Sequence, residues 1–198
     1  ISACLVGSEM CIRDSYISEN FQLKCVISTV DGNKYCVRDR VMLNESVNLL
    51  AEAVGRMKRL VEYVSKEYPN DEDVKRLKTN FNPNKITETL PTSELTAYSE
   101  NKGEKMAFCL NKTKNTGTLI DINTLTFVAI HELAHTMTKS IGHKQEFWKN
   151  FKFLLENAVK IGLYKPVDYK KENQSYCGMT ITDLSLIHIS EPTRQAEI

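Results

Sequence analysis

The residues best suited to chemistry lie in the segment HELAH, residues 131–135. On a helix, His131 and His135 project from one face one turn apart, so both imidazoles can reach a single Zn²⁺ at about 2.0–2.1 Å. Glu132 lies about 100° round the helix. There it flanks the metal without binding it, and can take a proton from a zinc-activated water. The pattern therefore predicts a catalytic zinc site.

A third ligand is expected on the segment that follows the helix. Gly142 is predicted to end the helix in a left-handed conformation, and His143 comes directly after it. With His143 as a ligand, zinc has three protein ligands and an open fourth position, as in catalytic sites. Glu156 is the competing candidate. Its spacing from Lys152 and Lys160 is that of a solvated charge ladder, which favours His143.

Glu146, three residues after His143, has two interpretations that the sequence leaves open. It is either a capping-box glutamate at the start of the next helix, or a group outside the ligand set that orients a ligand imidazole. The neighbouring Phe147 and Trp148 are predicted to be core residues.

The HELAH segment is predicted to form a buried helix. From Leu125 to Met137 the apolar residues cover most of the circumference, which is typical of a central helix. Asn123 is its predicted N-cap, and a second helix is expected from about residue 144 to 161. The alternative is a buried helix whose histidines only make hydrogen bonds. Unpaired histidines and a glutamate are costly in such a place, which favours a bound metal.

The remaining pattern predicts an α+β domain with a mixed sheet. Asp31-Gly32 marks an N-terminal hairpin, Asn115-Thr116-Gly117 gives a second hairpin-like signal, and residues 45–68 have the spacing of an amphipathic helix. A shorter helix follows Pro69. The predicted strands lie at residues 22–29, 34–38, 85–90, 104–111, 118–122 and 176–183.

HELAH followed by GHKQEFW resembles the SprT-like and WLM (Wss1-like) zinc metalloproteases, most clearly over residues 120–155. The resemblance implies a zincin-like metallopeptidase that hydrolyses protein or peptide substrates, with zinc held by His131, His135 and His143 and with Glu132 as general base. Family members act on DNA-associated proteins. The alternative is a non-catalytic zinc-binding, DNA-associated or regulatory module. The spacing to His143 is longer than the WLM pattern and shorter than many SprT-like ones, and no cysteine zinc ribbon follows.

Three further segments are interpreted through this resemblance. Zincins bind the substrate peptide along an edge strand, and residues 104–111 are predicted to be that strand. Residues 176–183 contain Met179, which suggests the methionine turn of metzincins, although a terminal strand is favoured. Residues 164–171 mix tyrosines with lysines and suit nucleic-acid contact, but a solvated loop is the preferred interpretation.

Composition sets broader limits on the chain. Its 198 residues carry a net charge of +1, which does not call for nucleic acid, and no apolar run reaches the ~20 residues of a membrane helix. Cys25, Cys36, Cys109 and Cys177 contain no CxxC pair, which predicts free thiols in a reducing compartment, the cytoplasm or nucleus. The sequence predicts no oligomeric state.

Residues 1–15 and 184–198 resemble translations of the two strands of a transposase adapter used in sequencing libraries. These segments are therefore predicted to be non-native tails and are left out of the fold. What remains, residues 16–183, is predicted to be a single zincin-like domain.

Overall fold

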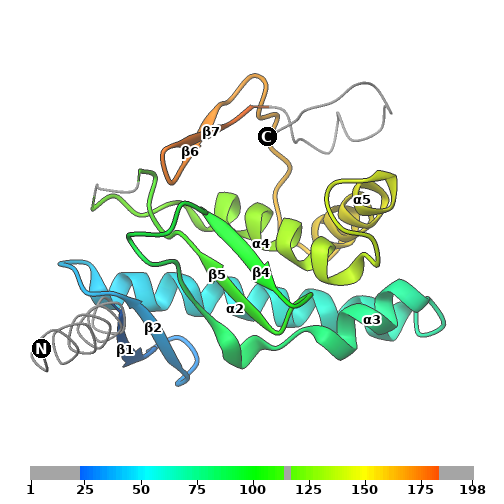
Figure 1. Cartoon of the computed structure of the whole chain (residues 1–198), viewed down its shortest axis with the longest axis horizontal. Coiled ribbons are helices and arrows are strands. Elements are labelled where there is room, and N and C mark those ends of the chain that lie inside the picture. Colours follow the sequence, from blue (N-terminus) through cyan, green and yellow to red (C-terminus); the bar gives the residue numbers. More distant parts are fainter. Residues whose placement is uncertain (1–22, 114–116, 183–198) are drawn as a thin grey trace, which may run out of the picture.

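The protein is an α+β domain, described in a computed structural model for residues 23–113 and 117–182 (Figure 1). The predicted tails and the hairpin signal at Asn115 lie outside or partly outside these residues. The helices are α2 (Leu43–Glu67), α3 (Glu72–Asn80), the short 3-10 helix η1 (Pro83–Lys85), α4 (Ile122–Met137) and α5 (Gln145–Lys160). The strands are β1 (Leu23–Ile27), β2 (Lys34–Arg38), β3 (Ile86–Glu88), β4 (Ala97–Glu100), β5 (Lys105–Phe108), β6 (Gln174–Tyr176) and β7 (Met179–Ile181).

The central sheet is mixed, as predicted, and has the strand order β3-β5-β4. β5 pairs parallel with β3 and antiparallel with β4. The prediction that residues 104–111 form the substrate-binding edge strand is therefore wrong, because β5 is hydrogen-bonded on both sides. Among residues 23–113 and 117–182, the strands at the edges of this sheet are β3 and β4. β4 was not predicted, and the strand expected at residues 118–122 is reduced to one bridge, between Asn111 and Leu119.

Two long helices pack side by side and carry the core. The buried residues of α2 recur along one face from Val47 to Val64, and α4 packs against α2, α3, α5 and β4. In Figure 1, α2 runs almost the length of the molecule, with the β1–β2 hairpin at one end and α3 at the other. The HELAH segment thus lies on a helix that other elements hold from several sides.

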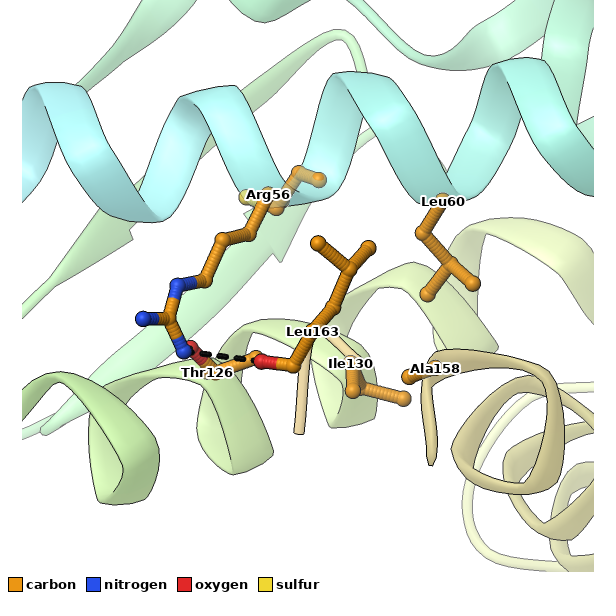
Figure 2. Close-up of a pocket in the computed structure, with 7 residues that line it drawn as sticks. Arg56, Leu60, Thr126, Ile130, Ala158 and Leu163 are labelled. Atoms are coloured by element: carbon orange, nitrogen blue, oxygen red, sulfur yellow. Dashed lines mark hydrogen bonds between the residues drawn. The ribbon is translucent and has the colours of Figure 1, made fainter. Parts of the chain in front are cut away.

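Two arginine contacts tie distant segments to this core. Arg56 of α2 donates to the carbonyl oxygen of Leu163 at 2.7 Å and to Oγ1 of Thr126 at 3.3 Å, beside a narrow apolar crevice (Figure 2). Arg40 Nη2 lies 2.8 Å from Oε1 of the fully buried Glu88 side chain. Because unpaired buried charge is costly, this ion pair fixes the segment after β2 against β3.

The four cysteines of the described residues form two disulfides, so the prediction of free thiols is wrong. Cys25 and Cys36 face each other in the register of the β1–β2 hairpin, with Cα atoms 3.9 Å apart. Cys109 and Cys177, 68 residues apart in sequence, join the end of β5 to the β6–β7 hairpin. Spacing alone does not reveal pairs created by sheet register and tertiary packing. The expectation of a reducing compartment rested on free thiols and loses that support. No helix among residues 23–113 and 117–182 is long and apolar enough to cross a membrane.

Candidate metal centre

Helix α4 positions two of the three histidines. It begins two residues earlier than predicted because Asp121, rather than Asn123, is the N-cap and accepts a hydrogen bond from the Thr124 N–H at 2.9 Å. Asn123 instead makes two hydrogen bonds with the backbone of Lys165. The helix is buried nearly all round, as predicted from its apolar residues, and this fixes the direction of His131 and His135.

The third histidine lies on the loop that joins α4 to α5. The predicted helix stop at Gly142 is wrong: α4 ends at Met137, and Thr138 is already extended. Gly142 nevertheless has a left-handed φ of 78°, which turns the chain immediately before His143. The loop after α4 brings His143 back to His131 and His135. The glycine-histidine pair thus makes the predicted turn, although α4 ends five residues before Gly142.

The three imidazoles converge through one type of atom. Nε2 of His143 lies 3.1 Å from Nε2 of His131 and 3.1 Å from Nε2 of His135, and the last two atoms are 3.2 Å apart. Three donors placed about 2.0–2.1 Å from one tetrahedral ion are about 3.3 Å from each other. The spacing therefore fits a metal ion such as Zn²⁺.

A network of hydrogen bonds does not account for this triangle equally well. A neutral imidazole offers one N–H in total, so among three mutually close Nε2 atoms at least one pair must face each other with two lone pairs or with two N–H groups. Burial lowers the pKa of His131 to about 3 and that of His135 to about 4, each with a further contribution from neighbouring positive groups. Both rings are therefore neutral near pH 7, which is the state that binds metals.

Glu132 is the one buried carboxyl group of α4, with 6% of its surface exposed. Burial raises the pKa of Glu132 to about 8. A carboxyl group with a pKa near neutrality can both accept and release a proton, as a general acid-base group must.

Phe147 supports all three histidines, a role that the prediction of a core residue missed. It is completely buried on α5. Its ring centroid lies 4.9, 4.4 and 4.6 Å from those of His131, His135 and His143, respectively. Aromatic packing against this ring restricts the orientation of the three imidazoles. Its position four residues after His143 is the signal that the sequence offered.

Glu146 matches neither of its two predicted roles. Its carboxylate accepts hydrogen bonds from the N–H groups of Lys139 (3.0 Å) and Ser140 (3.1 Å), which belong to the loop before His143. Hydrogen bonds from Ser140 and Lys139 lower the pKa of Glu146 to about 2. Glu146 therefore acts on the backbone of the loop and not on an imidazole or on the helix cap.

The other candidates lie away from the histidines. Glu156 has a side chain 56% exposed, 4.0 Å from Lys152, as the charge ladder predicted. Met179 is 42% exposed and contacts Thr96, so no methionine turn lies beneath the cluster. Within the described residues, His131, His135 and His143 are the group of side chains that could hold a metal ion.

A mixed α+β domain thus brings three histidines, from a buried helix and the loop after it, to one point, where they could hold a metal ion. The WLM domain, which is the Wss1-like zinc metalloprotease type, matches residues 73–195, and the chain belongs to this family. The prediction of WLM membership is thereby confirmed.

Three viral proteins are similar to the chain, and all are named only as uncharacterized. The chain is 29% identical to protein R325 of Acanthamoeba polyphaga mimivirus over 162 residues, which are 80% of this chain and 82% of that protein. It is 38% identical to protein 136R of Invertebrate iridescent virus 6 over 76 residues, 37% of this chain and 42% of that protein. Protein 042R of Invertebrate iridescent virus 3 is 41% identical over 59 residues, 30% of this chain and 36% of that protein. No solved structure matches the chain at a significant level.

Proposed function

We propose that the chain is a zinc-dependent metallopeptidase of the zincin type, formed by a single domain over residues 16–183. The observation that carries the proposal is the triangle of Nε2 atoms 3.1–3.2 Å apart, built on the HELAH helix that also holds the buried Glu132. The WLM family is associated with metalloprotease activity, which supports the same conclusion.

In peptide hydrolysis, the histidines and Glu132 have different roles. His131, His135 and His143 would hold Zn²⁺, which when bound polarises the scissile carbonyl and makes a water more acidic. Glu132 accepts the proton of the attacking water and delivers it to the nitrogen of the leaving amine. Burial of Glu132 suits this transfer, because the pKa of its carboxyl group is raised towards that of its proton donor.

The free edge of β4 is the proposed place of the substrate backbone. Cys109 N–H donates to the Thr96 carbonyl oxygen at 2.8 Å, so Thr96 and Tyr98 direct their backbone groups towards β5 in the alternating antiparallel pattern. Ala97 and Ser99 then direct theirs away from the sheet. An extended peptide can add to this edge as a further strand, and the turn after β4 contacts the end of α4.

A Ser99→Pro variant tests this edge. Proline removes the outward N–H of Ser99 without removing a hydrogen bond to β5. Since one hydrogen bond contributes about 0.5–1.5 kcal/mol, we expect kcat/KM for peptide hydrolysis to fall by about 2- to 10-fold, mainly through KM. Ser99→Ala keeps the N–H and is expected to behave as wild type. Equal activity of the proline variant would exclude the β4 edge.

The proposal is tested by proteolysis assays on the purified chain loaded with zinc. Cleavage of an unfolded protein substrate is expected to stop on treatment with a chelator and to return with Zn²⁺. Each assay is run with and without single-stranded DNA. Stimulation by DNA supports action on DNA-associated proteins, whereas DNA-independent cleavage supports a general peptidase. Zinc binding without turnover on diverse substrates would favour the non-catalytic module instead.

A further inference from the structure

The loop from Thr138 to Gly142 decides where the third histidine lies, yet it contains no helix or strand. Ile141 at its tip is 83% exposed, so apolar burial does little to hold that part of the loop. A ligand on such a segment is fixed only if other side chains hold the backbone. Polar contacts must therefore supply the order that packing does not.

Lys102, in the turn between β4 and β5, contacts this loop. Its Nζ donates to the carbonyl oxygens of Thr138 (2.9 Å) and Ser140 (2.7 Å), and both contacts are partly buried. Two carbonyl groups two residues apart thus converge on one ammonium group. Hydrogen bonds from a charged donor are stronger than those between neutral groups.

The β4–β5 turn that carries Lys102 is itself held in one conformation. Asn101 and Lys102 are left-handed, with φ of 47° and 59°, and Gly103 has a φ of 110°. A Cβ atom at Gly103 would lie 2.5 Å from Cγ2 of Thr136, so the turn touches α4 as closely as glycine permits. This close approach aims Lys102 at the loop rather than at solvent.

Two other charged side chains hold the same stretch of backbone. Glu146 of α5 accepts the N–H groups of Lys139 and Ser140, and Arg76 of α3 donates to the Met137 carbonyl oxygen at 2.7 Å. Lys102, from the β4–β5 turn, is the third charged side chain and donates to two carbonyl oxygens of this stretch. Side chains from three separate elements therefore bind the backbone between Met137 and Ser140.

We propose that Lys102 is a positioning residue for the metal centre: by binding the carbonyl oxygens of Thr138 and Ser140, it holds the loop so that His143 stays within reach of His131 and His135. The proposal rests on the proposed zinc site. It predicts that Lys102 strengthens zinc binding although its own charge opposes it. An ammonium group near the centre repels a metal cation, because like charges repel.

A charge effect and a positioning effect of Lys102 predict opposite changes in zinc affinity. If Lys102 acted only through its charge, Lys102→Met would bind zinc more tightly. If it positions the loop, the same variant binds zinc about 10–100-fold more weakly, the range found for groups that orient metal ligands. Zinc affinity is measured on the full chain by competition with a chromophoric chelator, independently of peptidase activity.

Lys105→Met is the matched control. Lys105 lies on the same hairpin but pairs with Glu100 at 3.5 Å, exposed to solvent, and its replacement is expected to leave zinc affinity unchanged. Lys102→Arg retains a charged donor and is expected to recover part of the affinity. Thermal unfolding of the zinc-free proteins shows whether each variant folds, and Lys102→Gln replaces Lys102→Met if the latter does not.

The outcomes separate this proposal from the proposed function. A wild-type chain that binds no zinc contradicts the metallopeptidase itself. A wild-type chain that binds zinc, with a folded Lys102→Met or Lys102→Gln variant of equal or greater affinity, overturns the positioning role alone. Failure of both variants to fold also overturns it, since Lys102 would then serve the fold rather than the loop.

Discussion

Replacement of Glu132 by glutamine is expected to lower kcat/KM for peptide hydrolysis by about 10²–10⁴-fold, the usual contribution of a general acid-base group. Glutamine has nearly the same size and shape as glutamate but cannot carry the proton of the attacking water. Because Glu132 is 6% exposed and burial already favours its neutral form, the neutral amide is tolerated at the same place. We therefore expect the loss to appear in catalysis and not in folding.

Two controls accompany the Glu132→Gln measurement. Zinc content per chain and the thermal unfolding temperature should match those of the wild type, which shows that the metal centre is intact. Wild-type kcat/KM should rise with pH as the Glu132 carboxyl group ionises, because the carboxylate is the proton acceptor. Burial places the pKa of Glu132 at about 8 without metal, and a bound cation lowers it, so this limb should lie below pH 8. A variant that holds zinc and still cleaves at the wild-type rate would rule out Glu132 as the base.

The sequence predicted those parts of the fold that local patterning determines. The hairpin at Asp31-Gly32, the amphipathic α2 and the α4–α5 pair all follow from turn chemistry or from the period of apolar residues. β4 was not predicted because its sequence, AYSE, is short and half-buried and has no apolar alternation of its own. Its strand conformation comes from pairing with β5. The prediction of an edge strand at β5 failed for the same reason, since a strand is an edge only relative to its neighbours.

In the metal centre too, local spacing predicted some residues and missed others. The histidines were identifiable because their spacing along one helix and one turn already brings them together. Lys102 was not, because it precedes the loop that it contacts by 36 residues, and no local spacing signals such a contact. Glu146 was recognised as notable from its position after His143, but its partners depend on the loop path, which changed when α4 ended at Met137 rather than near Gly142. Local spacing therefore predicts ligands well and the groups that position them poorly.

Replacement of His143 by alanine is expected to weaken zinc binding by more than about 100-fold, beyond the range for groups that only orient ligands. The ring supplies one of three donors, at 3.1 Å from each of the other two Nε2 atoms. Because His143 is exposed, its loss should change the stability of the zinc-free protein by less than about 0.5 kcal/mol. Competition with a chelator and thermal unfolding in chelator measure the two quantities separately.

Glu156→Gln is the matched comparison for His143→Ala, because Glu156 was the competing third ligand. Its side chain is exposed on α5 and faces Lys152, so zinc affinity should not change. The zinc affinities of the two variants show which residue is the third ligand. Weak binding in His143→Ala with unchanged binding in Glu156→Gln supports the three-histidine site. The reverse result would assign the third ligand to Glu156, and the loop held by Lys102 and Glu146 would then need another function.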